Sequence, residues 1–301
     1  MVRTMKRQAA LSYPKLSISQ CTTYTADIRA DISTYRAVGA DGIGLWEFKL
    51  PHGQEAAIGE LLAQTGLRPT LCVPEVASIV PDPFFAEPKD PRERRTALCA
   101  AIRRFAPFDP VAVMVLTGAP DGHDLAGLRR TVVEGLKAAA DTAGKVGVTL
   151  GLEPLRRTSG TLVTTLPETL ELIEEAGVPE VGVIYDVWHL WDVPNGLDDL
   201  RRYAHRLVGV QVNDYRQPTR SWCDRLLPGE GRANVPAIFA TLEAAGYDGW
   251  YDVEIFSDNG LFGNAYPDSL WDLPAEELAR RAVASFRAQW DARQAPGPSP
   301  T

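Results

Sequence analysis

Short apolar runs rich in Val, Ile and Leu alternate along the chain with longer stretches in which apolar residues recur every three or four positions. The short runs predict strands buried on both faces of a parallel sheet, and the longer stretches predict amphipathic helices. Strands are expected at Lys15–Gln20, Gly42–Glu47, Arg68–Val73, Val111–Leu116, Val148–Pro154, Val181–Asp186, Leu207–Asp214 and Gly249–Phe256. Helices are expected at Ala26–Val38, Glu55–Gln64, Arg92–Phe105, Leu125–Ala143, Pro167–Ala176, Gly196–His205, Pro236–Ala245 and Pro274–Arg293.

Eight alternating strands and helices predict an α/β fold, and eight is the number of units that closes a (β/α)8 barrel. The alternative is an open, doubly wound sheet, which would normally carry a Gly-rich dinucleotide loop after its first strand. The segment Gln20–Tyr24 contains no glycine. We therefore expect a single (β/α)8 TIM barrel at residues 14–293, with an N-terminal extension at 1–13 and a disordered, Pro-rich tail at 294–301.

The composition is that of a soluble globular protein, with 45% hydrophobic and 23% charged residues. A net charge of −8 argues against a nucleic-acid or membrane partner, since such a partner would need a basic surface. No apolar run reaches the roughly 18 residues of a membrane span, and the N-terminal segment lacks the apolar core of a secretory signal. The four cysteines are scattered, which is typical of reduced thiols in a cytoplasmic protein.

Polar residues end each of the last four predicted strands: Glu153, Asp186, Gln211 and Glu254. Side chains alternate between the two faces of a strand, so Glu153 shares a face with Gly151, and Gln211 shares one with Gly209. The opposite faces are mostly aliphatic, as with Val208 and Val210. We expect the aliphatic faces to pack under the helices, which points the four polar side chains into the C-terminal mouth of the barrel.

Three carboxylates in one mouth would repel each other and raise each other's pKa unless a cation lay among them. Carboxylate and amide oxygens suit Mn²⁺ or Mg²⁺, with Co²⁺ possible, better than metals that prefer thiolates. The sequence therefore predicts one divalent metal, with Mn²⁺ as the first choice. A single Asp or Glu at a strand end is more often a loop-capping or helix-capping residue, so the prediction depends on all four falling on one face.

Further candidates for substrate contact follow these strands or lie in loops that should reach the mouth. His189 stands three residues after Asp186, and the alternative for it is a loop histidine that caps a helix. His123 lies in a loop expected at the mouth. Arg225 offers a rigid fork of donors for a substrate oxygen, or else forms a surface ion pair with Asp224.

Three tryptophans, Trp46, Trp188 and Trp222, could form the wall of a sugar pocket or belong to the core. The segment from Pro74 to Pro91 is long for a simple connection and is a candidate lid or rim. The charged run Arg92–Arg95 is expected to be a solvated helix face. No Gly-rich or basic cluster suggests a phosphate cradle, which favours a free sugar or glycoside as the substrate.

Five motifs contain most of these candidates: Gly151–Pro154, Asp186–His189, Val210–Asp214, Pro228–Gly231 and Asp252–Glu254. In them the chain resembles the xylose-isomerase-like superfamily, which includes ketose 3-epimerases, hydroxypyruvate isomerase, and inosose isomerases and dehydratases. The resemblance covers about Lys15 to Trp290. It implies a metal held by the four strand-end residues and substrate oxygens contacted by His189 and Arg225. Many members have His where this chain has Gln211, and many have an acidic residue after the second strand, for which Glu47 is the candidate.

The implied activity is that of a metal-dependent isomerase or epimerase of a ketose or keto-cyclitol. In such enzymes the metal stabilises an enediolate, and the residues corresponding to Glu153 and Glu254 remove and return the proton. The alternatives are a lyase on the same scaffold, such as an inosose dehydratase or a 3-keto-glycoside-cleaving enzyme, and a non-catalytic sugar-binding barrel. A nuclease of the endonuclease IV type would need many histidines, and this chain has four. Relatives are often dimers or tetramers, so a homo-oligomer is possible.

Overall fold

The computed structural model describes residues 13–82, 86–118, 124–156, 158 and 161–294. One sheet holds β1 (Leu16–Ser19), β2 (Gly42–Gly44), β3 (Arg68–Pro69), β4 (Leu71–Cys72), β5 (Ala112–Val115), β6 (Leu150–Leu152), β7 (Gly182–Asp186), β8 (Leu207–Val212) and β11 (Tyr251–Val253). Its strand order is β3-β2-β1-β11-β8-β7-β6-β5-β4, and every pairing in it is parallel.

The two ends of this strand order, β3 and β4, are halves of one extended segment, since only Thr70 separates them. The first half pairs with β2, and the second half pairs with β5. Thr70 itself bridges both neighbours, because its N–H donates to Ile43 and its carbonyl accepts from Ala112. The sheet therefore closes on itself as a barrel of eight strands, with β3 and β4 counted as one. This confirms the single (β/α)8 barrel and excludes the open sheet.

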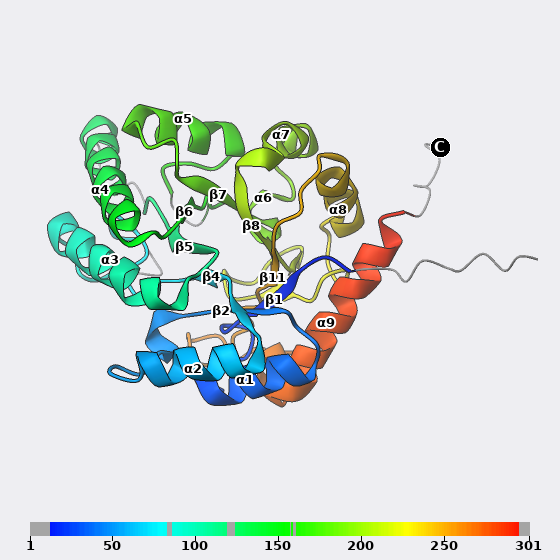
Figure 1. The fold of residues 1–301 in the computed structure, drawn as a ribbon. Coiled ribbons are helices and arrows are strands. Elements are labelled where there is room, and N and C mark those ends of the chain that lie inside the picture. The colour runs from blue at the N-terminus through cyan, green and yellow to red at the C-terminus, as the bar shows by residue number, and fades with distance from the viewer. Residues whose placement is uncertain (1–12, 83–85, 119–123, 157, 159–160, 295–301) are drawn as a thin grey trace, which may run out of the picture.

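Helices surround the closed sheet (Figure 1). They are α1 (Ile28–Ala37), α2 (Glu55–Thr65), α3 (Pro91–Phe105), α4 (Leu125–Val146), α5 (Leu166–Ala176), α6 (Val187–Leu190), α7 (Gly196–Tyr203), α8 (Val235–Ala244) and α9 (Ala275–Ala292). Within the described residues, no helix is both long enough and apolar enough to cross a membrane.

Each expected strand contains at least one observed strand, and each expected helix overlaps an observed one. The sequence reading missed α6, which begins directly after Asp186, and a hairpin of β9 (Asp214–Tyr215) and β10 (Arg225–Leu226). Both additions lie at the C-terminal ends of the strands. They bring residues that lie outside the barrel strands over the mouth of the barrel.

The expectation that Val208 faces outward, opposite Gly209, is wrong. The pairing of β7 with β8 shifts at this point, so that Val183 pairs with Leu207 while Ile184 pairs with Gly209. Val208 is the extra residue of this bulge. Its methyl groups lie close to the positions that a Cβ added at Gly182 or Gly151 would occupy. A bulge therefore interrupts the alternation below Gln211.

The expected lid, Pro74–Pro91, is partly a packed segment. Its residues from Ala77 to Val80 are buried, and Ile79 donates a backbone hydrogen bond to Leu116. The prediction of a solvated face for Arg92–Arg95 is wrong for Arg94, which is fully buried. Its guanidinium donates to the Ser78 carbonyl at 2.8 Å and to the Pro88 carbonyl at 2.9 Å. A sequence pattern could not reveal this, since the partners lie in a loop rather than on the helix.

Candidate functional site

The four strand-end residues lie together at the C-terminal end of the barrel, and all four are buried. Asp186 pairs with Gln211 in the register of β7 and β8, and Gln211 pairs with Asp252 in that of β8 and β11. Glu153 and Glu254 each come directly after a strand, β6 and β11. We call these four residues the floor of the site.

Arg225 joins two of the floor carboxylates. Its Nη1 lies 2.9 Å from Asp186 Oδ2 and 2.9 Å from Glu254 Oε2. The guanidinium is buried, and although burial opposes its charge, Asp186 and Glu254 raise the pKa of Arg225 above its ordinary value. The hairpin β9–β10 thus places a permanent positive charge between two negative ones. The alternative of a surface ion pair with Asp224 is not what the structure shows, because Asp224 binds Arg216 and Arg220 instead.

Burial and mutual repulsion act on the two glutamates. Burial, together with the charges of Asp186 and Glu254, raises the pKa of Glu153 well above its ordinary value. Burial also raises the pKa of Glu254 to about 7, against the opposing effect of Arg225. A carboxyl group with a pKa near neutrality can both accept and donate a proton at physiological pH. Glu254 is therefore suited to moving a proton, and Glu153 retains a proton more readily than an exposed glutamate does.

His189 lies on α6 beside the floor. Its Nδ1 accepts a hydrogen bond from the Arg156 backbone N–H at 3.0 Å, so a neutral ring carries its proton on Nε2. Burial and the nearby Arg225 and Arg156 lower the pKa of His189 well below its ordinary value, which keeps the ring neutral. Nε2 lies 3.7 Å from Asp186 Oδ2 and 3.9 Å from Glu153 Oε1.

The ligand atoms of Glu153, Asp186 and His189 lie within 4.8 Å of one another, which is close enough for a shared metal. A neutral imidazole has one acceptor nitrogen, however, and in His189 the Arg156 N–H occupies it. His189 therefore suits a donor role toward a substrate oxygen better than a ligand role.

Gln211 is a better candidate for a metal ligand than His189. Its Oε1 and Nε2 are both buried, and neither has a hydrogen-bond partner among the described residues. A buried amide without partners costs free energy unless something else satisfies it. The strand register places it beside Asp186, a floor carboxylate, and beside Asp252, two residues before Glu254. The residues present thus fit a divalent cation bound by carboxylate and amide oxygens.

Three residues that support the site were missed by the sequence reading. Asn213 donates to Asp186 Oδ1 at 2.7 Å, and Ser19 donates to Glu254 Oε1 at 3.1 Å. The alternation of side chains along a strand could have indicated Asn213, since it follows Gln211 by two positions and so shares its face. Arg156 acts on His189 through its backbone N–H, for which no sequence signal exists.

A cavity of about 200 Å³ opens above the floor. The described residues that line it include Glu153, His189, Arg225 and Glu254, and also the three candidate tryptophans, Trp46, Trp188 and Trp222. Glu47 does not line it. Its carboxylate accepts from the Glu75 N–H at 2.9 Å and pairs with Arg104 at 3.3 Å. His123 lies outside the described residues.

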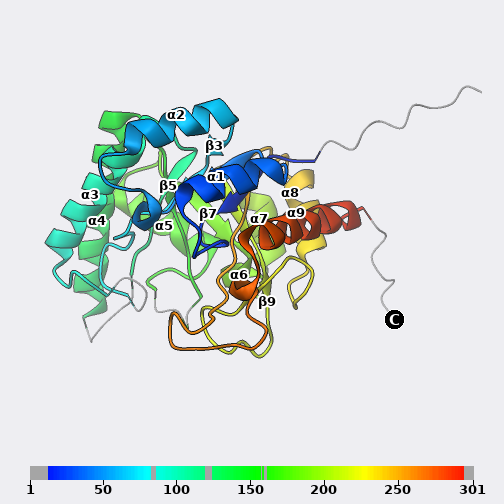
Figure 2. The same ribbon diagram turned by 90° about the horizontal axis from the view of Figure 1, so that it is seen from below.

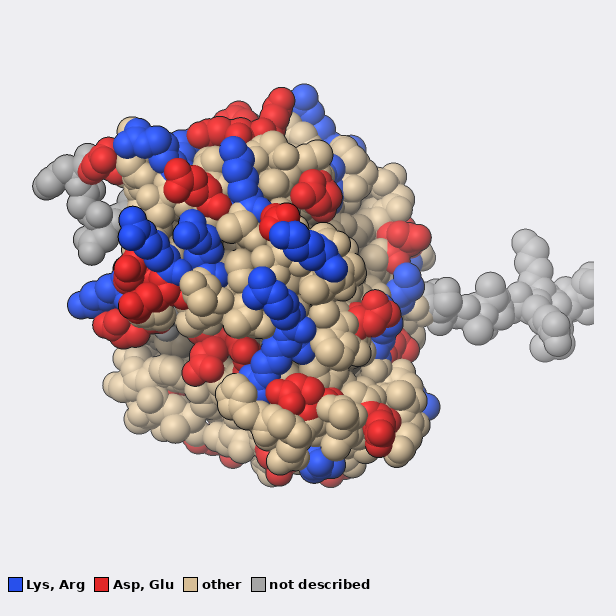
Figure 3. Space-filling model, turned by 60° about the vertical axis from the view of Figure 1, so that its left-hand side comes forward, with Lys and Arg blue, Asp and Glu red and all other residues tan. Residues whose placement is uncertain are grey.

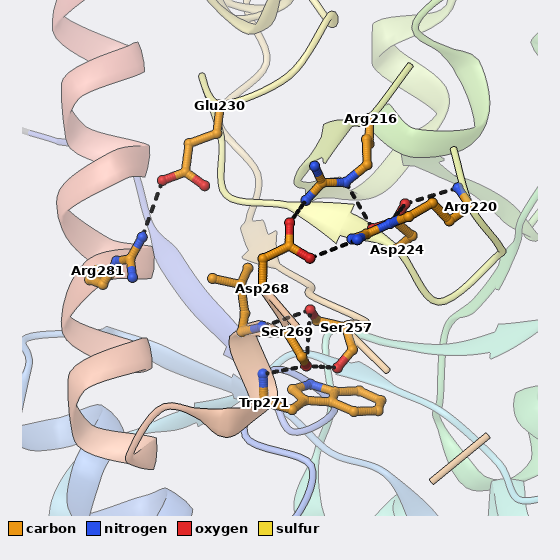
Figure 4. A network of polar contacts seen from close by, with 10 residues as sticks. Arg216, Arg220, Asp224, Glu230, Ser257, Asp268, Ser269, Trp271 and Arg281 are labelled. Atoms are coloured by element: carbon orange, nitrogen blue, oxygen red, sulfur yellow. Dashed lines mark hydrogen bonds and ion pairs between the residues drawn. The ribbon is translucent and has the colours of Figure 1, made fainter. Parts of the chain in front are cut away.

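Two loops beside the cavity are joined by a ring of four charges: Arg216, Arg220, Asp224 and Asp268 (Figure 4). Both arginines bind both acids, and Asp268 Oδ1 and Oδ2 lie 2.7 Å and 2.8 Å from Arg220 and Arg216. The first loop joins β9 to β10, and the second follows β11. Figure 2 shows them next to each other below the barrel. We call this set the ion-pair ring.

Charge on the surface shows no patch of one sign on the face drawn in Figure 3, where acidic and basic side chains are interspersed. Such a face lacks the basic stripe that a nucleic acid would require.

Comparison with known proteins places the fold. Residues 32–289 match the family model described as the xylose isomerase-like TIM barrel. The chain belongs to this family. The solved structures that resemble this chain include a protein of Sinorhizobium meliloti, which aligns with a TM-score of 0.78 at 26% identity over 91% of this chain and 98% of its own. The IOLI protein with a bound zinc atom aligns with a TM-score of 0.76 at 18% identity, over 94% of this chain and 100% of its own, which shows the shared fold.

The curated proteins that this chain resembles include several enzymes. Hydroxypyruvate isomerase of Escherichia coli is 27% identical over 166 residues, 54% of this chain and 62% of that protein. D-psicose 3-epimerase of Enterocloster bolteae is 28% identical over 169 residues, 54% of each chain. Inosose dehydratase of Geobacillus thermodenitrificans is 27% identical over 145 residues, 43% of this chain and 48% of that protein. The matched region thus spans between 48% and 62% of the length of these relatives.

Proposed function

We propose that this protein is a divalent-metal-dependent isomerase or epimerase of an α-hydroxy ketone, such as a ketose or a keto-cyclitol, in the cytoplasm. The observation that supports this most is the placement of two buried carboxyl groups, Glu153 and Glu254, on one cavity beside His189 and Arg225. Each can exchange a proton with the carbon next to a carbonyl. The isomerase and epimerase relatives agree with this class of reaction.

In this proposal one glutamate removes the proton from the carbon next to the carbonyl, and the other returns it. Return to the opposite face of the same carbon gives an epimer, and return to the neighbouring carbon gives an isomer. The His189 Nε2–H and the Arg225 guanidinium face the cavity as donors, so they can hold the two substrate oxygens while charge moves onto them. Trp46 would pack against the substrate from the side.

The floor residues Glu153, Asp186, Gln211 and Glu254 would hold the metal, with Mn²⁺ as the first choice and Mg²⁺ or Co²⁺ as alternatives. When bound, such an ion would supply a Lewis acid that polarises the substrate carbonyl. Elemental analysis after mild purification should then find about one divalent metal per chain. Absence of bound metal at a saturating supply of Mn²⁺ would favour a non-catalytic barrel.

Deuterium exchange tests the proposal directly. The protein is incubated with Mn²⁺ and a panel of ketoses in D₂O, and incorporation next to the carbonyl is followed by NMR. We expect Glu153→Gln and Glu254→Gln each to slow exchange about 10²–10⁴-fold, since each removes an acid–base group. The matched control is Glu47→Gln, whose carboxylate pairs with Arg104 away from the cavity and which should exchange at the wild-type rate. Exchange at the wild-type rate in either floor variant would reject the two-glutamate mechanism.

A lyase is the second candidate, because a dehydratase is among the relatives. The same proton removal leads to elimination when a hydroxyl or aglycone departs from the next carbon. The D₂O experiment separates the two, since an eliminated product identifies the lyase and a deuterated ketose without elimination identifies the isomerase.

A further inference from the structure

The cavity has two chemically different ends. The floor end presents Glu153, His189, Arg225 and Glu254, which are its charged or strongly polar residues. Seven of the described aromatic residues line the cavity together with aliphatic ones. Trp188 contacts His189 at the floor end, and the other six form the wall and rim. The six are Tyr24, Trp46, Phe48, Trp222, Phe256 and Phe262. We call them the aromatic cycle.

The aromatic cycle is closed, because each of its rings contacts the next one. From Phe48 through Tyr24 to Phe262, the ring centroids are 5.2 Å and 5.5 Å apart. From Phe262 through Trp222 to Phe256, they are 5.1 Å and 5.6 Å apart. Trp46 completes the cycle at 5.7 Å from both Phe256 and Phe48. These are the separations of favourable aromatic pairs.

The cycle runs from the floor to the solvent. Trp46 and Phe256 are only 9% exposed, and the Trp46 Nε1–H donates to Ser19 Oγ, which in turn binds Glu254. Phe48 and Phe262, in contrast, are 42% and 41% exposed. Large apolar side chains at the rim of a cavity mark a surface that a ligand covers.

The outer part of the cycle is held in place before any ligand arrives. Asp258 accepts backbone hydrogen bonds from Gly260 at 3.0 Å and from Phe262 at 2.9 Å, and its other oxygen accepts from Asn264 at 2.8 Å. These bonds fix the loop that presents Phe262. The ion-pair ring joins this loop to the loop of Trp222 (Figure 4). A preorganised apolar wall loses less free energy to ordering when it binds a ligand.

A free hexose is a poor match for such a wall. It has a hydroxyl on nearly every carbon, and each hydroxyl that loses water needs a new partner. The side chains of Phe48, Phe256 and Phe262 offer none, and the Trp46 Nε1–H is already bound to Ser19. The Tyr24 hydroxyl and the Trp188 Nε1–H are too few for all the hydroxyls of a hexose. A cationic ligand is disfavoured as well, because the Arg225 guanidinium already lies 4.6 Å from the Phe256 ring.

We propose that the substrate is an α-hydroxy ketone bearing an aromatic group, whose oxygens reach the floor and whose ring lies in the aromatic cycle. A 3-keto-glycoside with an aromatic aglycone has this chemistry. The inference rests on the proposed function, since it assumes that the floor binds the keto and hydroxyl oxygens.

Two small ketones that differ in one group test it: 2-hydroxyacetophenone, which carries a phenyl group, and hydroxyacetone, which carries a methyl group. Binding to the Mn²⁺-loaded protein is measured by calorimetry, and exchange of the hydroxymethylene protons in D₂O is followed by NMR. We expect the phenyl ketone to bind about tenfold tighter or more, from the additional apolar surface buried. We expect Phe48→Ala and Phe262→Ala each to weaken its binding about fivefold while leaving hydroxyacetone unchanged.

Leu261→Ala is the matched control, because Leu261 is exposed next to Phe262 and is not among the residues that line the cavity. It should bind both ketones as the wild type does. Equal affinities of the two ketones, or an unchanged preference in both phenylalanine variants, would overturn the inference. Competition by tetramethylammonium at the concentrations at which the phenyl ketone binds would also overturn it, in favour of a cation cage.

The outcomes separate this inference from the proposed function. If the phenyl ketone binds tightly but neither ketone exchanges deuterium, the aromatic cycle is supported as a binding site and the isomerase proposal fails. If both ketones exchange and bind equally, the isomerase proposal stands and the aromatic preference is wrong.

Discussion

His189 shows how a single backbone contact can decide what a side chain is able to do. The ring lies close enough to Glu153 and Asp186 to complete a metal site. The Arg156 N–H takes up Nδ1, however, and leaves Nε2 as a donor. A histidine next to carboxylates is therefore assigned by its hydrogen bonds as well as by its neighbours, because only a nitrogen with a free lone pair can bind a metal.

Gln211 provides a test of the floor that does not depend on turnover. Replacing it by Met, which has a similar length, removes two buried polar atoms that have no partner among the described residues. Without metal, we expect Gln211→Met to raise the free energy of unfolding by about 1 kcal/mol or more, since the cost of an unsatisfied group disappears. The stabilisation that Mn²⁺ gives the wild type should be reduced or lost. Urea unfolding in EDTA and in Mn²⁺ measures both effects.

Gln20 is the matched control for this prediction. It is equally buried, but its Nε2 donates to Asp31 at 2.8 Å and its Oε1 accepts from the Trp46 backbone N–H at 2.9 Å. We expect Gln20→Met to lower the free energy of unfolding by about 1–3 kcal/mol, because it leaves the buried Trp46 backbone N–H without its acceptor and removes one of the hydrogen bonds to Asp31. A loss of stability in metal-free Gln211→Met would show that the Gln211 amide is already satisfied.

At the scale of elements, the strands present the acids and the segments after them add the donors. Helix α6 supplies His189, and the hairpin β9–β10 supplies Arg225. Neither element is long enough to be detected as a periodic pattern. The loops that follow β9 and β11 differ in sequence position by some forty residues, yet the ion-pair ring makes them one unit.

Breaking the ion-pair ring should loosen these loops and leave the barrel intact. In Asp268→Asn, two arginines lose a shared carboxylate, while Asp224 still binds both. We expect the amide hydrogens of residues 258–268 to exchange clearly faster, and the free energy of unfolding to change by less than about 1 kcal/mol, since the pairs are partly exposed. Hydrogen exchange followed by mass spectrometry measures the first, and urea unfolding measures the second.

Asp198→Asn is the control for the ring. Asp198 forms one exposed ion pair with Arg201 at 2.8 Å on α7, far in sequence from both loops. It should leave exchange in residues 258–268 unchanged. Identical exchange in Asp268→Asn and wild type would mean that the loops are held by their own turns and the aromatic contacts alone.

At the scale of the whole molecule, apolar side chains fill the barrel interior and pack against glycines of the neighbouring strands. An added Cβ at Gly151 would lie 2.6 Å from Ile184 Cγ1 and 2.9 Å from Val208 Cγ2, both shorter than normal contact distances. These glycines therefore give the neighbouring strands' side chains room to meet across the barrel.

Gly151→Ala should consequently destabilise the barrel by about 1–3 kcal/mol, as expected for an overpacked core. The matched variant is Gly144→Ala, which lies within α4 and has no atom within 4 Å of an added Cβ. It should stabilise the protein by about 0.5–1 kcal/mol, because alanine favours a helix. Thermal and urea unfolding of the two variants give the comparison. A neutral Gly151→Ala would contradict the tight interior.

The barrel and the floor could be predicted because both follow from repetition. The hydrophobic pattern of a whole strand or helix is set by many residues, so one exception does not hide it. The alternation of side chains along the strands placed Glu153, Asp186 and Gln211 on the inner face even though Val208 breaks the alternation. The aromatic cycle and the ion-pair ring could not be predicted. Their members come from loops far apart in the sequence, and only the closed barrel brings those loops together. Arg94 was misread for the same reason, since its partners lie in another segment.

The ion-pair ring and the floor will respond differently to ionic strength. At about 1 M salt the screening length falls to roughly 3 Å, which weakens pairs near water far more than buried ones. Asp268 and its arginines are partly exposed, whereas Arg225, Asp186 and Glu254 are buried. Concentrated salt should thus release the loops that carry Trp222 and Phe262 while the charges beneath them keep their arrangement. The protein would then hold its reactive groups in place and lose the enclosure around them.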